Sequence, residues 1–189
     1  WHETRQTLQH SPCISLPGDW ETYLAGIDKK QRHEIRRKMR RLEESGVAWR
    51  WYIAADREAL PDEIEAFLAL MLQDAAKETF LTAPMRAHLR QTLTCAFDAG
   101  CLQLAFLEIN GQKAAAYLNF DYLNRLWIYN SGLDRGFMEF SPGWVLLGHL
   151  LKWANENGRE AFDFMRGDED YKYKFGARDR YVLRQTVER

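Results

Sequence analysis

The sequence predicts an α+β fold in three layers (α/β/α), with helices flanking a mixed, mostly antiparallel sheet that contains one parallel β-α-β crossover. Helical periodicity dominates residues 20–100, whereas residues 102–131 alternate as in three strands joined by tight turns. An apolar helix at 142–157 is then followed by a short apolar strand at 161–165. Strand, helix and strand in this order predict a right-handed parallel crossover.

Composition places the chain among globular proteins. It has 189 residues with a formal net charge of −1, 46% hydrophobic and 28% charged, which is ordinary for a soluble domain. No apolar run approaches the roughly 20 residues that a membrane helix needs, and we expect no signal peptide. Because the chain does not begin with Met, we expect it to be a segment of a longer protein.

Cysteine and histidine usage argues against metal and disulfide chemistry. Cys13, Cys95 and Cys101 are odd in number and lack metal or redox spacing, so we expect reduced thiols and a cytoplasmic location. The five histidines are His2, His10, His33, His88 and His149. Because no two of them have ligand spacing, we predict no metal site.

The first 46 residues are predicted to form an arm and two helices. Residues 1–16 are polar and aperiodic, as in an extended arm. Asp19 and Asp28 are good N-caps for two helices, and Gly46 follows the second helix as a C′ residue. The second helix carries eight Lys/Arg and four acidic residues over 28–44, so it is strongly basic.

The main domain is expected over residues 47–189. Alternation with aromatic residues predicts a strand at 47–54. Apolar residues then recur at helical spacing in two segments, one beginning at Pro61 and one beginning at Thr82 and ending at Gly100. These helices precede the sheet in the chain.

Three consecutive strands and one crossover complete the domain. Asn110-Gly111 is a strong type I′ hairpin signal between the strands 102–109 and 112–121. A second turn at 122–125 leads to the third strand, 126–131. A loop at 132–140 leads into the crossover helix, and a final strand at 181–187 is expected to close the sheet.

Local motifs carry a resemblance to a known family. They are Tyr129-Asn-Ser-Gly-Leu-Asp134, Phe140-Ser-Pro-Gly143, and Phe162-Asp-Phe-Met-Arg-Gly-Asp-Glu-Asp-Tyr-Lys172 with Phe175-Gly176. With the order of elements and the Arg-rich helix, they resemble the CelD/FemAB-like branch of GNAT acyltransferases from about residue 19 onward. The resemblance implies an N-acyltransferase that moves an acyl group from acetyl-CoA or another acyl-CoA to an amine by direct attack, in cell-envelope or polysaccharide biosynthesis.

The resemblance also implies a donor site where the crossover helix begins. In GNAT folds the pyrophosphate of acyl-CoA lies on backbone N–H groups at this helix end. Ser141 is expected to cap the helix and Gly143 to let a phosphate approach closely. The expected donor-binding residues are Arg135, Ser141, Gly143, Trp144 and Val145. The chain departs here from the usual Gln/Arg-x-x-Gly-x-Gly/Ala signature, and Ser-Pro-Gly is also an ordinary helix start.

The C-terminal motif supplies the expected catalytic residues. Lys172 matches the Lys of an aromatic-Lys-x-x-aromatic-Gly motif in Fem-type peptidyltransferases, where it is thought to hold or polarise the acyl donor. Asp168 is the expected general base, with Glu169 beside it as the other candidate, and Tyr129 is expected to protonate the leaving thiolate. A structural ion pair at the turn and an aromatic packed on the sheet are the alternative roles of these residues.

Three further residues are expected to contact substrate: Asp163, Glu169 and Tyr171. Asp163 lies inside a strand that should be buried on both faces, so its carboxylate needs a partner. Lys172, Arg166 and Tyr129 are the candidates for that partner, and the pattern favours a structural role for Asp163 over contact with substrate.

Two other functions remain open at this stage. An aminoacyl-tRNA donor would make the protein a Fem-type peptidyltransferase, the one enzymatic case that involves nucleic acid. A non-enzymatic module could instead hold an acidic partner or nucleic acid on the basic helix, although its interspersed acids are typical of a solvated helix. The expected partners are a small-molecule donor and acceptor, with a tandem GNAT-like half or a second copy of the chain.

Overall fold

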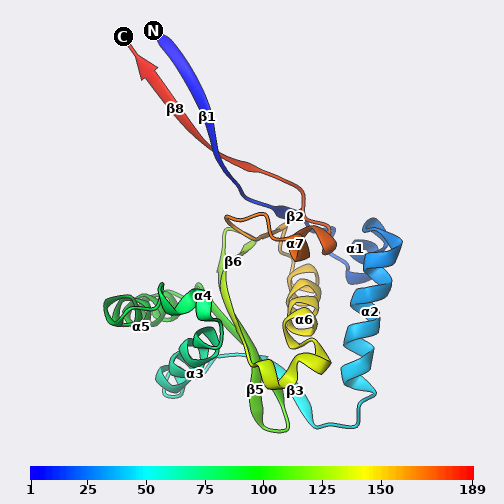
Figure 1. The fold of residues 1–189 in the computed structure, drawn as a ribbon. Coiled ribbons are helices and arrows are strands. Elements are labelled where there is room, and N and C mark those ends of the chain that lie inside the picture. The colour runs from blue at the N-terminus through cyan, green and yellow to red at the C-terminus, as the bar shows by residue number, and fades with distance from the viewer.

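The computed structural model describes all 189 residues and contains a three-layer α+β body from which a two-stranded ribbon projects (Figure 1). The body is built on a six-stranded sheet of order β2-β7-β6-β5-β4-β3. All neighbouring strands are antiparallel except β6 and β7, which are parallel and joined by the crossover helix α6. The predicted fold class is thereby confirmed.

The strands of the sheet are β2 (Cys13–Ser15), β3 (Trp49–Ile53), β4 (Leu102–Ile109), β5 (Gln112–Tyr122), β6 (Arg125–Leu133) and β7 (Ala161–Asp163). The helices are α1 (Trp20–Gly26), α2 (Lys29–Glu43), α3 (Leu60–Leu72), α4 (Ala75–Glu78), α5 (Ala83–Asp98), α6 (Pro142–Glu156) and α7 (Asp170–Lys174), with a 3-10 helix η1 (Arg135–Phe140). None of them is both long enough and apolar enough to cross a membrane.

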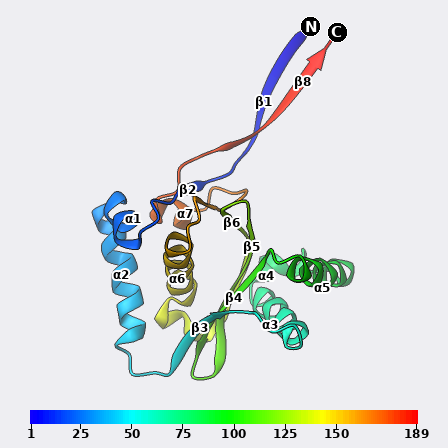
Figure 2. The same cartoon turned by 180° about the vertical axis from the view of Figure 1, so that it is seen from behind.

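Helices cover both faces of the sheet (Figure 2). Along β4, Ala105 and Leu107 pack in the core beneath α1, α2 and α6, whereas Leu104 and Phe106 pack against α3 and α5. Successive side chains of a strand point to opposite faces, so one apolar run serves two cores. This double burial explains why β4 and β5 read as almost continuous apolar segments.

Tight turns fix the register of the three consecutive strands. Asn110 and Gly111 have φ of 51° and 76°, the positive pair that a type I′ turn requires. Leu123 and Asn124 repeat this pattern with φ of 52° and 53° at the next turn. The predicted hairpin at Asn110-Gly111 is confirmed.

The prediction that the last strand closes the sheet is wrong. β8 (Tyr181–Glu188) pairs antiparallel with β1 (His2–His10), and both form the ribbon outside the body (Figure 1). The edge position next to β7 belongs instead to β2, from the N-terminal arm. Cys13 also pairs with Arg178, and this pairing continues through Ser11 and Arg180 into the ribbon. The last strand therefore pairs with the N-terminal arm and not with the sheet.

The basic helix α2 packs on the body. Ile35 and Leu42 are buried in the same core as α6. Four of its eight cations contact a carboxylate within the chain, and the other four form no salt bridge. Helix α2 thus shares a core with the main domain, and the predicted domain boundary at residue 46 stays a prediction.

His149 of α6 makes stability depend on pH. Its ring lies 5.5 Å from the rings of both Trp49 and Trp51. Burial, with a smaller contribution from the charge of Lys152, lowers the pKa of His149 from 6.5 to about 4. The unfolded chain therefore binds a proton that the folded chain excludes between these pH values, and stability is lost as the pH falls from 6.5 towards 4.

We expect the free energy of unfolding to be about 2 kcal/mol lower at pH 5 than at pH 7 through this group alone. Urea unfolding of the parent protein and of His149→Phe at both pH values measures this contribution. The pH-dependent difference should shrink by that amount in the variant, which keeps an aromatic ring between the two tryptophans. An equal pH dependence in both proteins would contradict the assignment.

Candidate active site

The parallel strands β6 and β7 separate and leave a pocket between them. β7 pairs with β6 only as far as Trp127, although β6 continues to Leu133. The chain then leaves β7 through residues 164–172, opposite the unpaired part of β6. The pocket between them has a volume of about 730 Å³ and is closed on the third side by Lys77 and Phe80, which come from α4 and the turn after it.

Lys172 organises one wall of this pocket. Its side chain is 3% exposed, and its ammonium donates to the carbonyl oxygens of Phe164, Arg166 and Gly167 at 3.3, 2.9 and 3.0 Å. It also lies 2.7 Å from a carboxylate oxygen of Glu169. The lysine therefore ties residues 164–169 into a compact turn, and its ammonium already has more acceptors than it has protons.

Glu169 contributes the carboxylate of the pocket. Its side chain is 59% exposed, and it folds back over Gly167, where an added Cβ would lie 2.5 Å from the carboxylate. Burial raises the pKa of Glu169, but the hydrogen bond from Lys172 and the nearby positive charges outweigh burial and lower it overall. Glu169 is thus ionised at neutral pH.

Two tyrosine hydroxyls lie in the pocket with suppressed acidity. Burial raises the pKa of Tyr171, with a smaller contribution from the charge of Glu169. Burial also raises the pKa of Tyr117 well above its usual range. Tyr129 lies on β6 at the same pocket, but its side chain is 41% exposed and packs edge-on against Phe120. Tyr171 is therefore a half-buried tyrosine whose hydroxyl stays protonated at neutral pH.

The open edge of β6 presents the backbone N–H and C=O of Ser131 to the pocket. The N–H of Ser131 faces away from β5 and donates to the side-chain oxygen of Asn130 at 2.9 Å. The carbonyl of Ser131 accepts a hydrogen bond from the ammonium of Lys77. Burial lowers the pKa of Lys77, while Asp74 and Glu169 raise it by smaller amounts. Side chains thus occupy the positions that a bound strand-like ligand would take.

Four of the predicted site residues line this pocket: Tyr129, Glu169, Tyr171 and Lys172. Asp168, the predicted base, is exposed and does not line it. Its predicted role is therefore not supported by its position and stays a prediction.

The expected partners of Asp163 are wrong. Its carboxylate is buried and pairs with Arg125, at 3.1 Å, across the parallel β6–β7 pair. It also accepts from the N–H of Met165 at 2.8 Å and lies 3.5 Å from the hydroxyl of Ser11. Asp163 thus holds the arm, β6 and the start of the 164–172 segment together, outside the pocket.

The start of α6 differs from the expected anion site. Ser141 is left-handed, with φ of 52°, and its side chain makes no capping hydrogen bond. The N–H groups of Trp144 and Val145 both donate to the carbonyl of Ser141, at 3.0 and 3.1 Å. Gly143 is buried, and a Cβ there would lie 2.9 Å from Leu133. The expectation that Ser141 caps the helix is wrong, and two of the three expected amides are already hydrogen-bonded.

Arg135 lies apart from these amides, beside a second pocket of about 350 Å³. This pocket follows β6 towards Leu133 and shares Lys77 and Ser131 with the larger one. The two pockets are therefore adjacent along the same strand edge, separated at the contact between Lys77 and Ser131.

Sequence reasoning missed Lys77, Tyr117, Asn130 and Arg166 as pocket residues. Lys77 follows a capping Asp74 in a four-residue helix, a pattern typical of any exposed turn. Tyr117 lies in an apolar strand and resembles a core aromatic. Of these residues, Asn130 could have been identified from the sequence, because it is a polar residue that directly follows Tyr129 in one of the motifs.

Residues 29–173 match the family profile described as an acetyltransferase (GNAT) domain, over most of the chain. The chain belongs to the GNAT family. It is therefore a transferase by family, and the GNAT fold accounts for the separated parallel strands and the helix that joins them. No curated protein matches the sequence closely enough to count as a relative.

Solved structures share the fold of this GNAT chain at low sequence identity. FemX is 12% identical with a TM-score of 0.70, over 92% of this chain and 60% of that one. The C-terminal domain of a putative lysylphosphatidylglycerol synthetase from Agrobacterium fabrum is 12% identical with a TM-score of 0.64, over 96% and 60%. L-PGS from Bacillus licheniformis is 14% identical with a TM-score of 0.60, again over 96% and 60%. The chain thus spans about 60% of the length of these structures.

Proposed function

We propose that the chain transfers an acyl group from an acyl-CoA thioester to an amine by direct attack, in the pocket between β6 and residues 164–172. The observation that carries the proposal is the open edge at Ser131, where the side chains of Asn130 and Lys77 occupy its backbone N–H and C=O at the pocket. An amide-containing donor that displaces them gains hydrogen bonds along the strand, as in strand addition.

The two adjacent pockets suit an elongated donor. In this arrangement the reactive carbonyl lies in the larger pocket, and the donor arm follows β6 past Lys77 into the smaller one. Arg135 at the far side of the smaller pocket then meets a phosphate of the donor. The proposed donor site therefore follows the strand edge and does not depend on the amides at the start of α6.

The pocket residues provide the required proton transfers. The amine attacks the thioester carbon, and Glu169, which is ionised, accepts the amine proton. The freed N–H of Ser131 stabilises the oxyanion that forms. When the carbon–sulfur bond breaks, Tyr171 protonates the departing thiolate. Lys172 acts as a positioning residue, because its ammonium holds the turn that carries Glu169.

An aminoacyl-tRNA donor is the second candidate. The closed start of α6 favours it, because an aminoacyl ester needs no pyrophosphate site at that helix end. The fold likeness to FemX and to lysylphosphatidylglycerol synthetases is compatible with either donor. The non-enzymatic module is less well supported, because four of the eight cations on the basic helix already contact carboxylates within the chain.

Calorimetry with acetyl-CoA tests the donor. We expect saturable binding, weakened roughly tenfold in Arg135→Ala by the loss of one charge-assisted contact. Arg41→Ala is the matched control, because Arg41 is an exposed arginine on α2, far from β6 in sequence. If acetyl-CoA does not bind and charged tRNA is retarded in electrophoresis, the donor is an aminoacyl-tRNA and not an acyl-CoA.

The partners of the reaction are proposed at the level of class. The acceptor is a small molecule with a primary or secondary amine, in keeping with cell-envelope or polysaccharide biosynthesis. A tandem GNAT-like half or a second copy of the chain would supply surfaces beyond those of this chain, and we propose a cytoplasmic location because acyl-CoA and charged tRNA are formed there. The calorimetric experiment depends on neither partner.

A further inference from the structure

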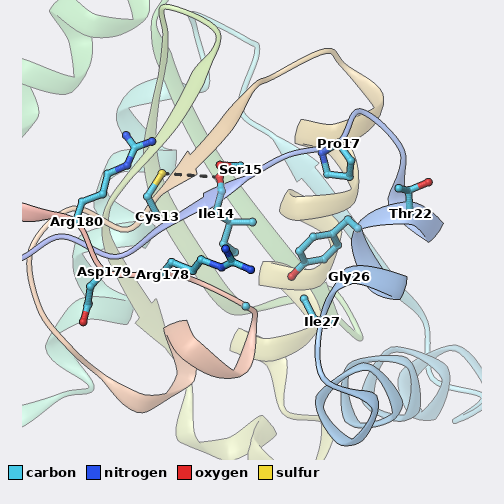
Figure 3. A pocket seen from close by; sticks show the side chains of 12 residues that line it. Cys13, Ile14, Ser15, Pro17, Thr22, Gly26, Ile27, Arg178, Asp179 and Arg180 are labelled. Carbon is cyan, nitrogen blue, oxygen red and sulfur yellow. Dashed lines mark hydrogen bonds between the residues drawn. The ribbon is translucent and has the colours of Figure 1, made fainter.

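A third pocket lies at the base of the ribbon (Figure 3). Its volume is about 570 Å³, and it shares no lining residue with the pocket beside β6. It forms where β2, α1 and the chain between α7 and β8 meet. The proposed acyl transfer uses none of its residues.

The pocket has a fixed floor. Gly176 has φ of +87°, and a Cβ there would lie 2.5 Å from the side chain of Ile27, so only glycine lets the two segments pack this closely. The hydroxyl of Tyr23 donates to the carbonyl of Phe175 at 2.6 Å and fixes α1 to the same segment. Apolar side chains of Ile14 and Ile27 complete the wall.

Two arginines supply the charge of the pocket. Arg178 and Arg180 line it, and neither forms a salt bridge. The nearest carboxylate in sequence, Asp179, is already engaged, because it accepts from the hydroxyl of Tyr173 at 2.7 Å and lies 3.1 Å from His10. Figure 3 shows the Asp179 side chain directed away from the others. The pocket therefore carries unneutralised positive charge.

The backbone of Arg178 is fixed beside the pocket, and the residue is exposed to solvent. The backbone of Arg178 exchanges two hydrogen bonds with Cys13, both at 2.9 Å, and these bonds fix the position of its Cα. From there its side chain extends towards Ile14 and Ile27 (Figure 3), and no protein group accepts from it. Arg180 lies at the other end, beside Cys13.

We propose that this pocket binds an organic oxyanion, a phosphate monoester or carboxylate attached to an apolar or aromatic group. The fork of the Arg178 guanidinium matches two oxygens of such a headgroup. The apolar walls formed by Ile14, Ile27 and the ring of Tyr23 cover the remainder of the ligand. The site is distinct from the proposed donor site, so it stands whether the donor is a thioester or an aminoacyl ester.

Calorimetry at fixed ionic strength tests the proposal with three probes: phenyl phosphate, benzoate and inorganic phosphate. We expect phenyl phosphate or benzoate to bind at least tenfold more tightly than inorganic phosphate, because only the aromatic probes reach the apolar wall. The tighter of the two aromatic probes identifies the headgroup. Arg178→Gln should weaken it at least tenfold.

Arg184→Gln is the matched control, because Arg184 lies on the exposed ribbon strand β8 outside the pocket. Amide resonances of Ile27 and Gly176 should shift on titration, which places the probe in this pocket. Equal affinity of the Arg178 and Arg184 variants, or shifts confined to the pocket beside β6, would overturn the proposal.

Discussion

Lys172→Met is expected to lower the free energy of unfolding by about 3 kcal/mol, the largest effect on stability that we predict for a single pocket residue. Methionine keeps the apolar stem but leaves the carbonyl groups of Phe164, Arg166 and Gly167 without their shared donor. Buried carbonyl groups without a donor are costly, and their turn is expected to loosen rather than repack. Urea unfolding followed by circular dichroism measures the change.

Glu169→Gln is the matched control for this variant. The carboxylate of Glu169 is more than half exposed, so losing its ion pair with Lys172 should cost less than about 1 kcal/mol. If Lys172→Met were no more destabilising than Glu169→Gln, the ammonium would not be holding the turn. A catalytic loss in Lys172→Met without a stability loss would instead favour direct contact between the lysine and the donor.

Tyr171→Phe is expected to lower kcat by about 10² to 10³-fold while leaving stability nearly unchanged. The hydroxyl of Tyr171 has no hydrogen-bond partner within the chain, so removing it costs the fold little. Its raised pKa keeps it protonated at neutral pH, as a donor to the departing thiolate must be. Steady-state kinetics with acetyl-CoA and an amine acceptor found by screening measure the loss.

Two comparisons separate proton donation from packing. A donor thioester with a more acidic thiol needs less help to leave, so it should restore much of the rate in Tyr171→Phe. Tyr129→Phe is the control on the opposite wall, and its kcat should change only slightly, because Tyr129 is exposed. If kcat falls strongly in Tyr129→Phe and only slightly in Tyr171→Phe, Tyr129 is the residue that protonates the thiolate.

Features set by neighbouring residues were predictable from the sequence. The turn at Asn110-Gly111 requires two positive φ values, which few residue pairs tolerate, so its hairpin could be located from two letters. The alternation in 102–109 and the helix after Pro142 also follow from local pattern. Lys172 and Tyr171 could be placed near the site because their short helix follows directly on the last strand of the crossover.

Features set by distant segments were not predictable. The partner of Asp163 is Arg125, at the start of another strand, and the sequence around Asp163 offers nearer cations that the fold directs elsewhere. The polar arm has no periodicity that would identify Cys13–Ser15 as the edge strand of the sheet. The start of α6 has the residues of an open helix end, but its amides are closed by a left-handed Ser141.

The pairing of β2 with β7 has a consequence for synthesis on the ribosome. Tyr23 and Phe175, joined by a hydrogen bond, are 152 residues apart in the chain, as are Ser11 and Asp163. Strand β2 must therefore wait for the later synthesis of β7 before the two can pair and the sheet acquires this edge. Closing so long a loop is slow, and until then the backbone of β2 stays unpaired and open to other nascent chains. Chaperone dependence during translation is the expected outcome.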